Sequence, residues 1–140
     1  MKYDDASWHY GGDFPSDLPP AAGGTHIAIF LTWCLLNGMA GDLHLEWSVD
    51  DMKKLQQREI TPGQFLFGAC DEKFTNEDLS KLGNDFAAAY FDYDKGNYLK
   101  DYFGSFPNTE SLYHVPDTWE TYDVIAPIIL KRFEAFQSSS

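Results

Sequence analysis

Apolar residues recur at helical spacing along most of this chain. The strongest run lies between residues 25 and 36, where Ile27, Phe30, Leu31, Cys34 and Leu35 follow helical spacing and further apolar residues fill the opposite side. A helix that is apolar nearly all round is typical of a core position. The pattern therefore predicts a central, buried helix that ends at Gly38.

Further helices are indicated by capping residues followed by narrower apolar stripes. The expected helix starts combine Ser48 with Asp51, Thr61 with Pro62, Thr75 with Asp78, and Asp117 with Glu120. A short helix is expected from about Asn97 to Phe103, and "SLYHV" alternates as a short strand or an extended linker would. Two apolar stripes are clearest. The first consists of Leu79, Leu82, Phe86 and Tyr90. The second consists of Tyr122, Ile125, Ile129, Phe133 and Phe136 and is interrupted by Pro127.

These elements predict a mostly α fold: a compact single-domain bundle of five to six helices around a buried central helix, with at most one or two short strands. A chain of 140 residues is long enough to bury a sizeable core, so residues 1–140 are expected to form one domain. Residues 1–24 should form an aromatic N-terminal arm packed on the bundle, and residues 137–140 a disordered tail.

The N-terminal arm admits two interpretations. Tyr3, Trp8, Tyr10 and Phe14 favour packing, and a core position for Trp8 would make Trp8→Ala cost roughly 3–5 kcal/mol. The alternative is a metal or acid–base site, since carboxylates and imidazole supply both ligands and proton carriers. That site would be built from Asp4, Asp5, His9 and Asp13.

The net charge of the chain limits the classes of partner that it is expected to bind. The chain carries 22 acidic and 10 basic residues, for a net charge of −12. Such a surface repels nucleic acid and anionic lipid and attracts basic proteins. No leader is expected, and the longest apolar run, interrupted by Thr32 and Asn37, is too short for a membrane span, so the cytoplasm is predicted. Cys34 and Cys70 are then expected to be reduced core thiols.

Motifs for common chemistry are missing. The sequence holds no phosphate-binding glycine loop, no nucleophile elbow, no zinc-ligand spacing, and no histidine next to either cysteine. The segment "DYDKGNYLKDYF" resembles a calcium-binding loop at Asp92 and Asp94, but Asn97 replaces the turn glycine and Phe103 the final glutamate. The prediction is therefore no metal, no cofactor and no catalytic residue.

Acidic and aromatic residues alternate between Phe91 and Phe106. Tyrosines supply rigid anchors and carboxylates complement a basic partner, which favours a protein-binding face there. Ordinary packing, with half of the rings in the core, is the alternative interpretation. The predicted partner-binding residues are Asp92, Tyr93, Asp94, Tyr98, Asp101 and Tyr102.

Four segments resemble a bacterial family of small stand-alone proteins of unknown function: "MKYDDASWHYGGDFP", "THIAIFLTWCLLNG", "TPGQFL" and "LYHVPDTWETYDVIAPIILKRF". The resemblance implies a small cytoplasmic bacterial protein and carries over no catalytic residue. By analogy with acidic immunity proteins, the leading hypothesis is a non-enzymatic immunity protein that occludes a basic toxin or effector, as a monomer or homodimer. The alternative is a small metal-dependent or acid–base hydrolase that uses the Asp4, Asp5, His9 and Asp13 cluster.

Overall fold

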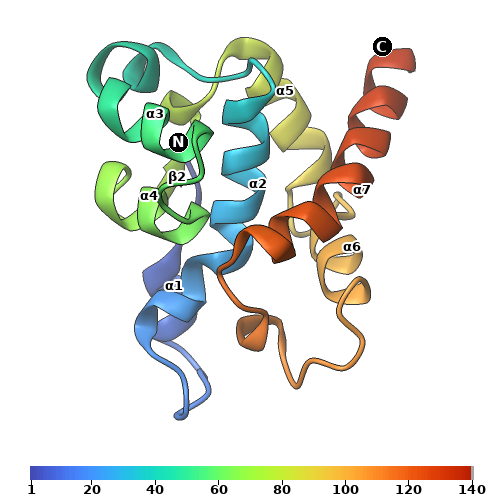
Figure 1. The fold of residues 1–140 in the computed structure, drawn as a ribbon. Coiled ribbons are helices and arrows are strands. Elements are labelled where there is room, and N and C mark those ends of the chain that lie inside the picture. Colours follow the sequence, from blue (N-terminus) through green and yellow to red (C-terminus); the bar gives the residue numbers. More distant parts are fainter. Residues whose placement is uncertain (140) are drawn as a thin grey trace.

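One helix forms the centre of the molecule, and the other elements surround it (Figure 1). The computed structural model describes residues 1–139, and the predicted mostly helical class is confirmed. The α-helices are α1 (Ala6–Tyr10), α2 (Thr25–Leu36), α3 (Val49–Gln56), α4 (Pro62–Ala69), α5 (Lys81–Tyr90), α6 (Tyr98–Gly104) and α7 (Trp119–Ser138). The strands are β1 (Lys2–Asp5) and β2 (Lys73–Thr75), and short helical turns are η1 (Pro20–Gly24), η2 (Leu43–Trp47), η3 (Asn76–Asp78) and η4 (Leu112–His114).

Helix α2 occupies the core, as its all-round apolar pattern predicts. Every residue from Thr25 to Leu35 is buried. Phe30 lies at the centre of an aromatic cluster, with its ring 5.1 Å from that of Phe91 and 5.3 Å from that of Tyr98. Helices from both halves of the chain therefore share one core around α2.

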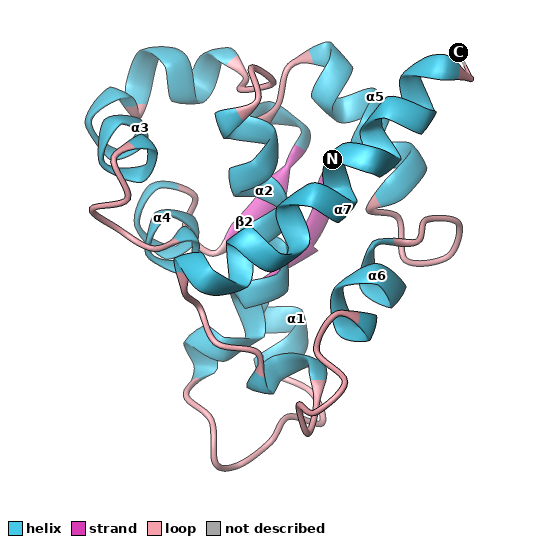
Figure 2. Cartoon of the chain, turned by 45° about the vertical axis from the view of Figure 1, so that its right-hand side comes forward, coloured by secondary structure: helices cyan, strands magenta, loops and turns pink. Residues whose placement is uncertain are grey.

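A two-stranded sheet fixes the first residues of the chain to a segment about seventy positions later (Figure 2). Strand β1 pairs antiparallel with β2, with Lys2 opposite Thr75 and Asp5 opposite Lys73. Asp5 then caps α1, because its side chain accepts a hydrogen bond from the Ser7 N–H. The β1–β2 pairing thus joins the start of the chain to the segment that follows α4.

The predicted core role of Trp8 is wrong. Its side chain is 55% exposed, and the Lys2 ammonium lies 5.2 Å from its ring centroid. Helix α1 has only five residues, and its buried position is taken by Ala6. Tyr3 and Phe14 hold the arm instead, through ring contacts with Phe74 and with Tyr113. Removing the Trp8 ring would therefore open no core cavity.

Two of the predicted caps are confirmed. Thr61 caps α4 in a reciprocal capping box with Gln64, and Pro62 is the first helical residue. Thr75 and Asp78 form the same box at η3. Both boxes depend on residues three positions apart, so the local sequence is sufficient to specify them.

Two other caps differ from the prediction because tertiary partners claim the side chains. The Ser48 hydroxyl bonds His44 Nδ1 and does not cap α3. Asp117 accepts hydrogen bonds from the Thr61 hydroxyl and from the Gly63 N–H, both at the start of α4. Helix α7 is capped by Thr118, the next residue along the chain.

The remaining differences concern element ends. Helix α5 begins at Lys81, so Leu79 precedes it, and Leu82 is 43% exposed although it belongs to the predicted stripe. The "SLYHV" segment forms the η4 turn. Helix α7 contains Pro127 and continues to Ser138, within the predicted tail, whereas Ser140 lies outside the described residues.

The longest apolar run forms α2, and both cysteines lie near the core. Among residues 1–139, no helix combines the length and the apolar character that crossing a bilayer requires. Cys34 is buried and Cys70 half-buried, and both are free thiols.

Candidate functional site

The face predicted between Phe91 and Phe106 is largely internal. Tyr98 and Tyr102 are both fully buried, and their rings lie 5.8 Å apart in the core. The Tyr98 hydroxyl donates to the backbone carbonyl of His26. The two tyrosines are core residues, so their predicted role as partner anchors has to be corrected.

Asp101, also predicted to contact a partner, lies on α6 and forms hydrogen bonds with residues of α5 and α7. Its carboxylate accepts hydrogen bonds from Arg132 Nε at 2.8 Å, Arg132 Nη2 at 2.9 Å and the Tyr90 hydroxyl at 2.7 Å. Burial alone would raise the pKa of Asp101, but these hydrogen bonds outweigh burial and hold it below its ordinary value. The group therefore stabilises the contacts among α5, α6 and α7.

Asp101→Asn should lower the free energy of unfolding by about 1 kcal/mol at neutral pH, since it weakens hydrogen bonds to a charged acceptor. Because the folded-state pKa is depressed, this stabilisation is present above the unfolded-state pKa and is lost as the pH falls through the folded value. Urea unfolding of wild type and variant at pH 7 and at roughly pH 2–3 would measure it. A difference that stays constant with pH would contradict the assignment.

Three predicted partner residues remain on the surface. Asp92 accepts hydrogen bonds from the N–H groups of Asp94 and Lys95, which closes the loop after α5. These bonds hold the pKa of Asp92 below its usual value. Asp94 is exposed, and Tyr93 is 43% exposed. The accessible part of the predicted face is therefore a single short loop.

A larger exposed apolar feature lies on η2 and the start of α3. Leu45, Trp47 and Val49 are 56%, 82% and 55% exposed, and Val49 borders one surface hollow with Leu45 and another with Trp47. The π-helical turn of η2 directs His44 into the core, where it is fully buried. Residues 42–51 are called the 42–51 surface below.

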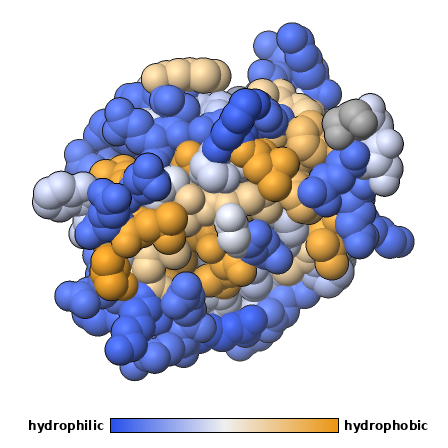
Figure 3. Space-filling view, turned by 90° about the horizontal axis from the view of Figure 1, so that it is seen from above, coloured by the Kyte–Doolittle hydropathy of each residue, from blue (hydrophilic) through white to orange (hydrophobic). Residues whose placement is uncertain are grey.

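Four acidic residues share the 42–51 surface with these apolar side chains. Figure 3 looks down on the end of the molecule that carries η2 and α3, where apolar side chains lie among hydrophilic ones. Lys53 and Lys54 follow on α3 and offset part of the charge. No ion pair formed within residues 1–139 uses the four carboxylates of this surface, which are Asp42, Glu46, Asp50 and Asp51.

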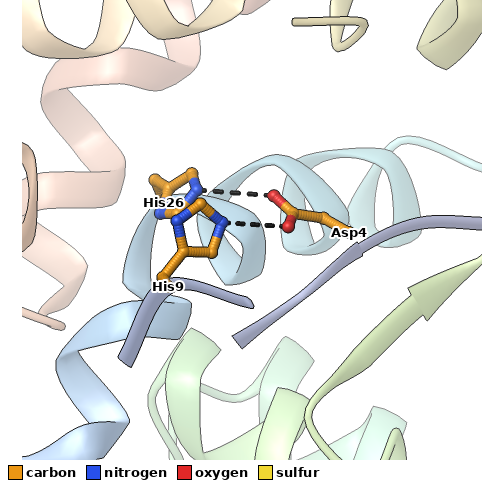
Figure 4. Close-up of side chains that lie close together, drawn as sticks. All are labelled: Asp4, His9 and His26. Atoms are coloured by element: carbon orange, nitrogen blue, oxygen red, sulfur yellow. Dashed lines mark hydrogen bonds and ion pairs between the residues drawn. The ribbon is translucent and has the colours of Figure 1, made fainter. Parts of the chain in front are cut away.

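A buried cluster joins the N-terminal arm to α2 (Figure 4). The Asp4 carboxylate lies 2.9 Å from His9 Nε2 through Oδ1 and 3.5 Å from His26 Nε2 through Oδ2. Strand β1 supplies Asp4, α1 supplies His9 and α2 supplies His26. Asp4 and His26 are buried, and the His9 side chain is 13% exposed.

Two tyrosines complete this cluster. The Tyr113 hydroxyl lies 2.7 Å from His9 Nδ1, and the Tyr93 hydroxyl lies 3.1 Å from His26 Nε2 and 3.4 Å from His9 Nε2. Burial opposes the charged form of Asp4, but the two histidines outweigh burial and lower its pKa. Burial lowers the pKa of His26, which favours a neutral imidazole.

The cluster contains half of the hydrolase site that the sequence suggested. Asp4 and His9 meet, whereas Asp5 binds Lys2 and caps α1, and Asp13 is exposed. Burial opposes ionisation of Asp5, but Lys2 and Ser7 together lower its pKa to about 2. His26 was not predicted as a site residue. Its position in an otherwise apolar, buried helix was the available signal, because a buried imidazole needs polar partners.

A second buried cluster contains His44, Cys70 and Asp78. His44 Nε2 lies 2.7 Å from Asp78 Oδ1, and Cys70 Sγ is 3.7 Å from each of these atoms. Burial raises the pKa of the Cys70 thiol well above its ordinary value, and Asp78 raises it further. Because the thiol and the carboxylate share one imidazole nitrogen, His44 cannot relay a proton between them as a catalytic triad does.

An apolar cleft of about 450 Å³ lies beside η1, α4 and η4. His114 and Asp117 are among the residues that line it. His114 Nε2 is paired with Asp17 at 3.0 Å, and Asp117 accepts the Gly63 N–H at the start of α4. Both groups therefore already have structural partners.

Comparison with known proteins shows the family. The model of a domain of unknown function, DUF7832, matches residues 2–115, so the chain belongs to that family. No curated protein and no solved structure matches the chain significantly.

Proposed function

We propose that this member of the DUF7832 family is a non-enzymatic binding protein that captures a basic protein through the 42–51 surface. The observation that carries the proposal is the 82% exposure of Trp47 beside exposed Leu45 and Val49. Tryptophan is among the residues most enriched at the energetic centres of protein interfaces. Leaving its large ring in water forgoes the stabilisation that burial against a partner would provide.

Charge supports a basic partner. Asp42, Glu46, Asp50 and Asp51 form no ion pair within the described chain, and the whole protein carries a net charge of −12. Opposite charges accelerate the encounter of two proteins, and a buried aromatic anchor then slows their separation. The 42–51 surface combines both elements in one segment.

The partner class that we propose is a basic bacterial toxin or effector, which the protein would neutralise by covering its functional surface. Support comes from the acidic balance and from the analogy with acidic immunity proteins, not from a shared fold. The hydrolase alternative has less support, because the Asp5 carboxylate binds Lys2 and caps α1, and Asp13 is exposed.

Trp47→Ala should weaken partner binding by about 2 kcal/mol, or roughly 30-fold in Kd, mainly through faster dissociation. Wild type is first used to capture the partner from the native host, and the purified partner is then measured by surface binding kinetics. Trp8→Ala is the matched control, because Trp8 is also more than half exposed but lies outside the 42–51 surface. Its Kd should not change.

Charge reversal tests the same surface independently. Asp50→Lys and Asp51→Lys should slow association and reduce its dependence on salt. Circular dichroism should confirm that each variant remains folded. A captured partner that is acidic, or a Kd that responds to Trp8→Ala and not to Trp47→Ala, would contradict the proposal.

A further inference from the structure

We propose that the Asp4 carboxylate and the Nε2 atoms of His9 and His26 bind a divalent transition-metal ion. The ion would fasten the N-terminal arm to the central helix. This inference is independent of the proposed partner binding.

The geometry of the cluster suits such an ion. Both Nε2 atoms face the Asp4 carboxylate in Figure 4, at 2.9 Å and 3.5 Å from its oxygens. Zinc binds nitrogen and oxygen at about 2.0–2.2 Å, so two ligands of a tetrahedral ion lie roughly 3.4 Å apart. Both nitrogen–oxygen separations lie within about half an ångström of that value, and the three ligand atoms lie within 4.8 Å of one another.

The Asp4 carboxylate provides the second observation. Asp4 is fully buried, and its Oδ2 atom has no hydrogen-bond partner among the described residues. Its other oxygen, Oδ1, accepts the Asp5 N–H at 2.8 Å in addition to facing His9. A buried carboxylate oxygen without a hydrogen bond is costly, and a cation bound at Oδ2 would remove that cost.

Neighbouring groups hold the ligands in place. The Tyr113 hydroxyl lies 2.7 Å from His9 Nδ1, on the side of the ring opposite Nε2. Such outer contacts orient metal-binding imidazoles in known sites. The Tyr93 hydroxyl lies near both Nε2 atoms, at 3.1 Å and 3.4 Å, where a fourth ligand is needed.

The donor set indicates the class of metal. Imidazole nitrogen with one carboxylate suits zinc, iron, nickel or copper, whereas magnesium and calcium prefer a shell of oxygens. The other buried cluster is a weaker candidate, because both oxygens of Asp78 already accept hydrogen bonds, from His44 and from the Thr75 N–H. Within residues 1–139, the Asp4 cluster combines a buried and a half-buried imidazole with a buried carboxylate oxygen that has no hydrogen bond.

The test uses the full chain stripped with a chelator and titrated with Zn²⁺ and with Co²⁺. We expect one ion per chain by calorimetry, a ligand-field absorption band with Co²⁺, and a higher melting temperature with metal. His9→Gln should weaken Zn²⁺ binding by about 100-fold or more, since losing even an outer contact costs 10–100-fold. His26→Gln should do the same.

His44→Gln and His114→Gln are the controls, because each removes a histidine from a different cluster. Both should keep the Zn²⁺ affinity of wild type. If His26→Gln fails to fold, His9→Gln decides alone, since the His9 side chain is partly exposed. Absence of binding to the wild type, or loss of binding in His44→Gln with retention in His9→Gln, would overturn the proposal.

Discussion

Tyr98→Ala should lower the free energy of unfolding by about 3–5 kcal/mol, the range found when a large core aromatic is reduced to alanine. Its ring is fully buried and lies 5.3 Å from the ring of Phe30 and 5.4 Å from that of Phe91. Removing it leaves a cavity beside the central helix and removes the hydroxyl that donates a hydrogen bond to the carbonyl of His26. For a chain of this size the melting temperature should fall by roughly 10–20 °C.

Two conservative variants separate the ring from its hydroxyl. Tyr98→Phe should cost only about 1 kcal/mol, because it removes one hydrogen bond and keeps the packing. Tyr102→Phe should cost almost nothing, since the buried Tyr102 hydroxyl has no hydrogen-bond partner among the described residues. Urea unfolding of the three variants provides the measurement. A Tyr98→Ala variant as stable as Tyr102→Phe would show that Tyr98 is not a core residue.

The sequence already contained a signal that these tyrosines face inward. Tyr98 and Tyr102 are four residues apart, which places them on one face of the expected helix, and Phe106 continues the same spacing beyond its end. The rings of Tyr102 and Phe106 are in fact 5.6 Å apart. Composition alone could not distinguish an interface from a core, because tyrosine serves both, but periodicity favoured the core.

Local patterns predicted the parts of the fold that depend on neighbouring residues. Apart from Thr32, the run from Ile27 to Leu35 is apolar on every face, and a position inside the core satisfies that pattern. Thr61 with Gln64 and Thr75 with Asp78 cap their helices through contacts three residues apart. Such elements are specified without knowledge of the tertiary structure.

Long-range contacts account for most of what the sequence could not specify. Asp117 accepts hydrogen bonds from Thr61 and Gly63 at the start of α4, more than fifty residues earlier, although an acid before Glu120 resembles a local cap. Trp8 lies on the outer side of a helix too short for periodicity to show which side is buried. Such side chains can contact either neighbouring or distant residues, and which contact forms depends on the three-dimensional fold.

The candidate sites depend on the same long-range contacts. His26 meets Asp4 across 22 residues because the β1–β2 pairing places the arm against α2. Spacing motifs detect ligands that share one helix or loop, so no motif could find this pair. The exposure of the Trp47 ring could not be predicted from the sequence either, because an apolar residue type does not indicate whether its side chain is exposed.

Asp4→Asn should destabilise the metal-free protein by about 2 kcal/mol. The amide keeps the size of the carboxylate but removes its negative charge, which weakens the hydrogen bonds that Oδ1 forms with His9 Nε2 and with the Asp5 N–H. Asp13→Asn is the matched control in the same arm, because Asp13 is exposed, and its effect should stay within about 0.5 kcal/mol. Urea unfolding at neutral pH with a chelator present measures both. Equal stabilities of the two variants would show that the Asp4 cluster does not hold the N-terminal arm on the central helix.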